Sequence, residues 1–207
     1  DERNILDALS RDIDKNHISN NSWGPNDDGQ LNKPASGWTA FNDALAKGLN
    51  KGRNGLGVLY VFSGGNGAWE GDYSSADSAT SSRGVIAVCA VDAAGERSPY
   101  SERGSNLTVC APSGRSTTPA TAPEITTTAV KDKYTEDFGG TSAAAPMVSG
   151  VAALMLQANP RLTWRDVPLI LARTARQVDA QSSGWRSHSS PLVEGQPGAH
   201  DTLHYHH

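Results

Sequence analysis

One serine in the sequence stands where a hydroxyl could act as a nucleophile. Ser142 follows the glycine turn of Phe138-Gly139-Gly140-Thr141 and opens a run of small and apolar residues that extends to about Ala158. We expect this run to be a helix, so Ser142 would lie at a helix N-terminus, where backbone N–H groups stabilise negative charge. Pro146 suits the first turn of such a helix, because a missing N–H costs little there. The pattern predicts an attacking serine, although an N-capping serine has the same local sequence.

A second polar side chain could assist that chemistry. Asn66 lies in the loop Ser63-Gly64-Gly65-Asn66-Gly67, directly after the nearly continuous apolar run 56–62. A carboxamide can donate a hydrogen bond to a developing oxyanion without bringing a charge of its own. The same letters also form a good turn. With Ser142 downstream, we interpret Asn66 as an oxyanion donor.

The elements that must position these residues follow an α/β pattern. Continuous apolar runs are typical of strands buried on both faces of a parallel sheet, and apolar residues at helical spacing indicate helices between them. We expect helices over 5–13, 38–49, 142–158 and 163–177, and strands over 17–23, 56–62, 84–91 and 106–111. Residues 113–137 are polar and predict a loop. Residues 185–207 hold five of the six histidines without apolar periodicity, and we expect a disordered tail after a single domain over 1–184.

Composition excludes several classes of protein. The 207 residues, 37% of them apolar, suffice for one domain with a sizeable core. A net charge of −4 makes nucleic acid an unsuitable partner. The longest apolar runs, such as 151–156, fall short of the roughly 20 residues of a membrane span, so no membrane segment is expected. Cys89 and Cys110 fall in two predicted strands; they are either free core thiols or a disulfide, if those strands are neighbours in register.

Two other folds with reactive loops fail on the residues themselves. A dinucleotide-binding loop starting at Gly65 would need its third glycine at position 70, which is Glu70. An α/β-hydrolase would need a Gly-x-Ser-x-Gly elbow around its nucleophile, and Ser142 has none.

The string Gly140-Thr141-Ser142-Ala-Ala-Ala-Pro146 resembles the nucleophile motif of the subtilisin-like serine proteases, the subtilases. The resemblance covers roughly residues 7–180. It implies the C-terminal part of a three-layer α/β peptidase domain with a mainly parallel sheet flanked by helices, the N-terminal part being missing. It also implies that Ser142 forms an acyl-enzyme, with the oxyanion held by Asn66 and the Ser142 N–H.

A further stretch, Ser22-Trp23-Gly24-Pro25-Asn26-Asp27-Asp28-Gly29, is similar to the kexin and furin branch, the proprotein convertases, and to its bacterial relatives. The resemblance implies cleavage after basic residues, with substrate contacts from Ser22, Trp23, Gly24, Ser63, Gly64, Gly65 and Asp77. It also implies a structural calcium ion held by Asp27, Asp72 and Glu102. The chemistry agrees, because carboxylates from separate loops converge only around a cation. The alternative is that these acids are ordinary solvated surface charges.

The general base of such a protease is not apparent. A subtilase needs an Asp and a His before its serine, yet only His17 precedes Ser142, and Lys15-Asn16-His17-Ile18 lacks the family's His-Gly-Thr context. The chain therefore resembles an endopeptidase fragment that is inactive alone, or else a non-catalytic binding module. For the parent protein we expect protein or peptide substrates, an extracytoplasmic location and a possible downstream domain. Asp7 matches an acid that contacts a second basic residue, whereas another acid of the branch is replaced near Asn32-Lys33.

Overall fold

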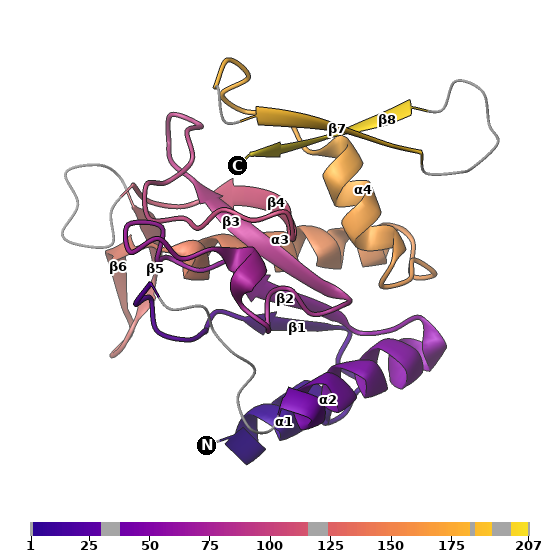
Figure 1. Ribbon diagram of the computed structural model, residues 1–207. Helices are drawn as coiled ribbons and strands as arrows, with labels where there is room; N and C mark the ends of the chain where they lie inside the picture. The colour runs from indigo at the N-terminus through magenta and orange to yellow at the C-terminus, as the bar shows by residue number, and fades with distance from the viewer. Residues whose placement is uncertain (1, 30–37, 116–123, 183–184, 192–199, 207) are drawn as a thin grey trace.

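The computed structural model describes residues 2–29, 38–115, 124–182, 185–191 and 200–206 (Figure 1). Two helices and three strands form the first half of the chain: α1 (Glu2–Ser10), β1 (Ile18–Asn21), α2 (Trp38–Lys51), β2 (Leu59–Ser63) and β3 (Val85–Val91). The second half contains β4 (Leu107–Pro112), β5 (Ile125–Ala129), β6 (Lys133–Phe138), α3 (Thr141–Ala158), α4 (Asp166–Thr174), β7 (Trp185–Pro191) and β8 (His200–His206). Short 3-10 turns cover Gly52–Gly55 and Ser74–Ala76.

A four-stranded parallel sheet forms the centre of the fold. Its strand order is β1-β2-β3-β4, and every neighbouring pair is parallel. The five residues of β2 are all buried, because helices cover both faces of the sheet. Since the strands are parallel, the loops that leave their carboxyl ends meet at one edge, where ligands bind in open α/β sheets.

Helices flank the sheet on two sides. Figure 1 shows α1 and α2 together on one side and α3 behind the strands. Tyr60 of β2 donates a hydrogen bond to the Leu9 carbonyl at 2.5 Å, and Phe62 meets Phe41 of α2 edge to face, so α1 and α2 cover one face of this strand. The opposite helix, α3, contacts all four strands. The expected three-layer α/β architecture with a parallel sheet is confirmed.

Helix α3 is the apolar centre of the second layer. Seven of its residues are buried, and the alanines that follow Ser142 let it approach the sheet closely. By length and composition this helix could also cross a membrane. Here it packs on the sheet of the domain, and a core helix satisfies the same criteria.

The segment from 113 to 137, which the sequence predicts to be a loop, contains a β-hairpin. Strands β5 and β6 pair antiparallel. The connecting residues Lys131 and Asp132 both have positive φ, of 61° and 55°, as a hairpin turn of type I′ requires. The β-branched run Ile125-Thr126-Thr127-Thr128 favours a strand although most of it is polar. The loop prediction was wrong because polar residues can form a partly exposed hairpin when many of them are β-branched.

The histidine-rich tail contains a strand pair. Strands β7 and β8 pair antiparallel from Trp185↔His206 to Pro191↔His200. The expectation of a disordered tail over 185–207 stays a prediction. Its sequence has no apolar periodicity, which is the signal that would have indicated strands.

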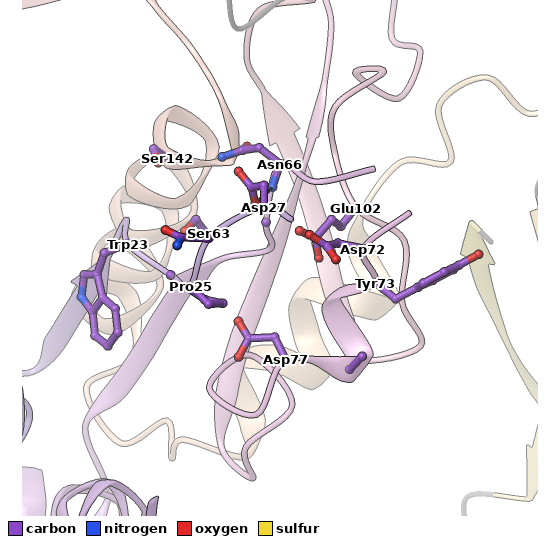
Figure 2. A pocket seen from close by; sticks show the side chains of 14 residues that line it. Trp23, Pro25, Asp27, Ser63, Asn66, Asp72, Tyr73, Asp77, Glu102 and Ser142 are labelled. Atoms are coloured by element: carbon purple, nitrogen blue, oxygen red, sulfur yellow. Dashed lines mark hydrogen bonds between the residues drawn. The ribbon is translucent and has the colours of Figure 1, made fainter. Parts of the chain in front are cut away.

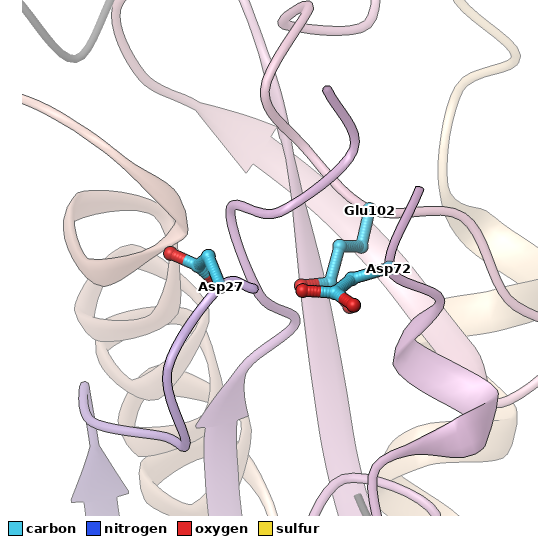
Figure 3. A group of neighbouring side chains, drawn as sticks. All are labelled: Asp27, Asp72 and Glu102. Atoms are coloured by element: carbon cyan, nitrogen blue, oxygen red, sulfur yellow. The ribbon is translucent and has the colours of Figure 1, made fainter. Parts of the chain in front are cut away.

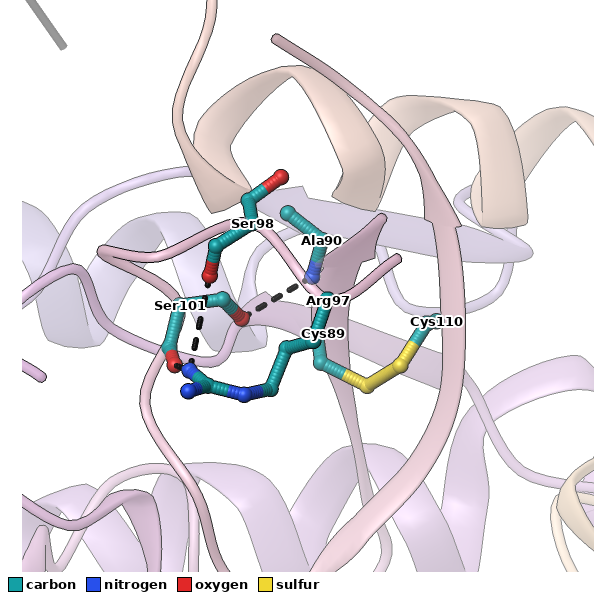
Figure 4. The surroundings of a disulfide bond; sticks show 6 residues. All are labelled: Cys89, Ala90, Arg97, Ser98, Ser101 and Cys110. Carbon is teal, nitrogen blue, oxygen red and sulfur yellow. Dashed lines mark hydrogen bonds between the residues drawn. A yellow bond between two sulfur atoms is a disulfide. The ribbon is translucent and has the colours of Figure 1, made fainter. Parts of the chain in front are cut away.

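The two cysteines are joined. Cys89 of β3 and Cys110 of β4 are direct partners in the parallel register, and their sulfur atoms form a disulfide (Figure 4). This decides between the two alternatives that the sequence left open. The bond ties together two strands whose following loops both approach the Ser142 pocket.

Candidate functional site

The candidate site lies at the carboxyl edge of the sheet. The segment 22–29 follows β1, the Asn66 loop follows β2, and the loop with Glu102 follows β3. Ser142 is the second residue of α3. A single pocket brings these segments together (Figure 2). Its lining comprises Trp23, Gly24, Pro25, Asn26, Asp27, Ser63, Gly65, Asn66, Asp72, Tyr73, Ala76, Asp77, Glu102 and Ser142.

Ser142 is held at the start of α3 by Ser22, which directly follows β1 and does not itself line the pocket. Gly140 precedes the helix with φ +74°, a left-handed conformation that suits glycine. The Ser22 hydroxyl donates to the Ser142 carbonyl at 2.9 Å, and the Ser142 hydroxyl lies 3.5 Å from the Ser22 carbonyl. Ser22 therefore ties the strand β1 segment to the helix that carries the nucleophile.

The carboxamide of Asn66 has a fixed orientation. Its Oδ1 accepts the Thr141 backbone N–H at 2.8 Å and the Thr141 hydroxyl at 2.9 Å. A backbone N–H can only donate, so the atom that faces it must be the oxygen. The Asn66 NH₂ group is thereby left to donate elsewhere, and Figure 2 shows the Asn66 side chain extending toward the turn that carries Ser142. A helix N-terminus and a free amide donor on one site are what an oxyanion needs.

Three carboxylates meet beside this pair. Asp27, Asp72 and Glu102 each place an oxygen within 4.8 Å of the others (Figure 3). Among the described residues no ion pair neutralises any of the three, while Glu102 is only 6% exposed. Hard oxygen ligands from three separate loops suit a calcium ion. The donor set therefore fits the cation that the resemblance implies.

The electrostatics of this acid cluster are unfavourable without a cation. Burial first, and then the charges of Asp27, Asp72 and Asp77, raise the pKa of Glu102 to about 7, while a hydrogen bond from the Gly67 N–H opposes them. Burial also raises the pKa of Asp27, with Asp72 adding to it. The cluster is linked to the oxyanion loop, because Asp27 Oδ1 accepts the Asn66 N–H at 3.4 Å.

Glycines allow the acids to come this close to the Asn66 loop. A Cβ on Gly65, whose φ is +99°, would collide with the Glu102 carboxylate, and one on Gly67 would collide with Asp72. The two glycines on either side of Asn66 therefore leave room for the two carboxylates.

Asp77 and Trp23 line other parts of the same pocket. Asp77 accepts the Ala79 N–H at 2.7 Å, and burial raises its pKa. Trp23 packs edge to face on Phe62 at 5.4 Å and is 39% exposed, so one side of its indole remains open. The pocket thus combines an aromatic wall with a partly buried acid, which suits a long cationic side chain.

Some residues implied by the resemblance lie outside the pocket. Gly64 is buried, with its N–H on the Val88 carbonyl, and does not line it. Asp7 lies on α1 and pairs with Arg11, directly after the end of that helix. The pair Asn32-Lys33 lies outside the described residues. His17 lines a second pocket with Arg53 and Leu156, separate from Ser142, in agreement with its lack of a catalytic context.

Thr141 is a functional residue that the sequence alone did not single out. Its side chain is fully buried, donates to Asn66, and accepts the Gly65 N–H at 3.2 Å. The available signal was a hydroxyl residue directly before the nucleophile at a helix start, which is easily taken for a simple cap.

The comparisons with known proteins agree with this geometry. The model of the Subtilase family matches residues 2–190. The chain is 38% identical over 179 residues to the Protease KEX1 of Kluyveromyces lactis, covering 86% of this chain and 23% of that protein. It is 38% identical over 192 residues to the human proprotein convertase subtilisin/kexin type 6, covering 90% and 19%. The chain thus spans about a fifth of the length of these relatives.

Solved structures show the same fold. The serine protease of Aeromonas sobria, in complex with its chaperone ORF2, superposes with a TM-score of 0.78 at 22% identity, over 99% of this chain and 40% of that one. A protease from Pseudoalteromonas arctica gives a TM-score of 0.64 at 27% identity, over 86% and 51%. The family match, the identity to kexin-type relatives and the Ser142–Asn66 geometry lead to one conclusion: the chain belongs to the subtilase family of serine proteases and is similar to its kexin-like members.

Proposed function

We propose that the protein carrying this chain is an endopeptidase that cleaves after Arg or Lys through an acyl-enzyme on Ser142. The observation that supports this most is the orientation of Asn66, whose amide donors are left free beside the Ser142 helix start. In the reaction the Ser142 oxygen bonds to the scissile carbonyl carbon and its proton passes to a base. Asn66 and the Ser142 N–H stabilise the oxyanion, the amine leaves with a proton, and water then releases the acyl group.

The specificity for basic residues is proposed from the acids of the pocket. Asp77 lines it as a partly buried carboxylate and would pair with the substrate cation. Asp27, Asp72 and Glu102 would hold a calcium ion that neutralises their mutual repulsion and fixes the loops around Asp77. The strand segments 22–24 and 63–65 would hold the substrate backbone on either side.

The general base is not among the described side chains around the pocket. We therefore expect the 207-residue chain by itself to hydrolyse peptides negligibly, since loss of the base costs about 10⁶-fold in a related triad enzyme. This gap is also what favours a second candidate, a non-catalytic binding module that keeps the cleft. The disulfide between Cys89 and Cys110 supports an extracytoplasmic location, because such bonds persist in oxidising compartments.

The test uses the full-length protein with two fluorogenic peptides that end in Arg and in Leu. We expect cleavage of the Arg peptide, its loss in Ser142→Ala, and a far larger penalty on Arg than on Leu in Asp77→Ala. Equal penalties on both peptides would refute the basic pocket. An inactive wild type that binds Arg peptides in calcium would support the binding module instead.

A further inference from the structure

The peptide group that joins Gly140 to Thr141 is held at both ends. Its N–H donates to Asn66 Oδ1 at 2.8 Å, and its carbonyl accepts the Ser113 hydroxyl at 2.8 Å. A peptide group is planar, so fixing the carbonyl also fixes the direction of the N–H. The orientation of the Asn66 carboxamide is therefore set in part by a residue that does not line the pocket.

Ser113 is well placed for this role. It is 4% exposed and directly follows β4, the strand farthest from β1. Its N–H donates to the Val91 carbonyl at 2.8 Å, which fixes its backbone on β3. The hydroxyl of the fully buried Tyr100 lies 2.8 Å from the Gly114 carbonyl and 3.1 Å from Ser113 Oγ. Its proton goes to the carbonyl, which can only accept, and the single proton of Ser113 goes to Gly140.

Gly140 gains from this support, although its carbonyl also accepts the Ala143 N–H at 3.0 Å, because the glycine conformation itself is permissive. At φ +74° and ψ 171° it adopts a backbone state that glycine enters and leaves easily. The Asn66 side chain packs directly on it, since a Cβ on Gly140 would lie 3.3 Å from Asn66 Oδ1. A rotation of this peptide group would move Asn66 and its amide donors together.

We propose that Ser113 is a positioning residue for the oxyanion donor Asn66, acting through the Gly140–Thr141 peptide group. The proposal rests on the proposed function for its kinetic consequence, but its structural part does not. The Tyr100 hydroxyl contacts both Ser113 and the neighbouring Gly114, and two residues later the same loop supplies Glu102. The backbone from Tyr100 to Glu102 thus joins the surroundings of Ser113 to the acid cluster.

The kinetic test is a double-mutant cycle in the full-length protein with the Arg peptide. We expect Ser113→Ala to lower kcat about tenfold with KM unchanged, the effect of losing one well-placed hydrogen bond. In an Asn66→Ala background the same change should lower kcat less than about twofold, because Ser113 is proposed to affect kcat by orienting the Asn66 carboxamide, which that background lacks. A loss of similar size in both backgrounds, or a change confined to KM, would overturn the proposal.

The matched control is Ser98→Ala. Ser98 is a fully buried serine whose hydroxyl donates to the Gly114 carbonyl at 2.7 Å, and it does not contact Gly140. It should change stability without changing kcat. If Ser113→Ala does not fold, Ser113→Cys, which retains a weaker donor, replaces it and should give a smaller kcat loss.

A second readout separates this proposal from the proposed function. Amide hydrogen exchange of the segment Gly139–Ala143 reports the Thr141 N–H, whose partner is Asn66. We expect Ser113→Ala to raise this exchange rate about tenfold and Ser98→Ala to leave it unchanged. An inactive wild type would refute the proposed endopeptidase activity, but the exchange measurement would still test the positioning role of Ser113. Unchanged exchange in Ser113→Ala would overturn the positioning role.

Discussion

Replacing Glu102 by Gln should have opposite effects on stability with and without calcium. In the calcium-free protein the buried carboxyl has a pKa of about 7, raised from its ordinary 4.5 by burial first and then by the neighbouring acids. The folded state therefore holds this proton more tightly than the unfolded state. Stability contributed by the protonated form is fully present below about pH 4.5 and is lost as pH rises through 7.

The magnitude follows from that pKa. Ionising Glu102 in the fold costs roughly 2 kcal/mol above pH 7, after allowance for partial screening by solvent. Glu102→Gln is never ionised, and its side-chain oxygen can still accept the Gly67 N–H, which lies 3.1 Å from Glu102 Oε1. In chelator at pH 8 the variant should thus be more stable than the wild type by about this amount, and the difference should vanish near pH 4.

Calcium should reverse the order. The wild type should gain stability with added calcium, whereas Glu102→Gln, with one anionic ligand fewer, should gain little. The assay is urea unfolding at pH 4, 6 and 8, in chelator and in millimolar calcium. Glu136→Gln, an exposed acid on β6, is the control and should behave as wild type. A Glu102→Gln variant that is less stable than wild type in chelator at every pH would refute the reasoning.

Three further changes test separate parts of the structure. Asn66→Ala should lower kcat by about 10² to 10³ with KM nearly unchanged, because its amide donates only to the developing oxyanion; steady-state kinetics on the full-length protein would contradict this if KM alone rose. Replacing both Cys89 and Cys110 by Ala should lower the free energy of unfolding by about 3 kcal/mol, as expected for a loop with a sequence separation of 21. Denaturation in reductant should bring the wild type to the same value, and a clearly smaller loss would contradict a stabilising role of the disulfide. Gly65→Ala should lower the free energy of unfolding by about 1 to 3 kcal/mol and weaken calcium binding, because a Cβ at φ +99° meets Glu102. Thermal melting at several calcium concentrations is the assay, and a calcium response equal to that of the wild type would contradict this prediction.

Much of the sheet and of the nucleophile could be predicted from the sequence, for a physical reason. A strand buried on both faces is nearly continuously apolar, and the runs at 59–62 and 85–91 have this composition. Ser142 stands out because a glycine turn and a long apolar helix are both needed around it. Helix α4 spans Asp166–Thr174 rather than 163–177. Thr163 and Asp166 form a reciprocal pair of bonds before it: Thr163 Oγ1 accepts the Asp166 N–H at 3.3 Å, and Asp166 Oδ2 accepts the Thr163 N–H at 2.8 Å.

The parts that escaped prediction depend on contacts across the fold. A polar hairpin at 125–138 buries little, so it leaves no hydrophobic period to read. The disulfide needed the register of β3 on β4, which no spacing reveals. The roles of Thr141 and Ser113 consist of single hydrogen bonds between distant segments, and a serine or threonine in a sequence looks the same whether it makes such a bond or faces water.

The arrangement of the site follows from the direction of the strands. Because β1 to β4 are parallel, each delivers its following loop to the same edge, and each loop brings one different component. The loop after β1 supplies Asp27, the loop after β2 supplies Asn66, and the loop after β3 supplies Glu102. The last strand supplies no residue of the pocket lining but delivers Ser113, which holds the peptide group before the nucleophile. Neighbouring strands are hydrogen-bonded, and β3 and β4 are also joined by the disulfide, so the segments that carry Glu102 and Ser113 leave from one sheet. We expect the stability of the acid cluster and the precision of the oxyanion donors to change together. Glu102, in the loop after β3, and Ser113, directly after β4, are therefore the informative residues to alter.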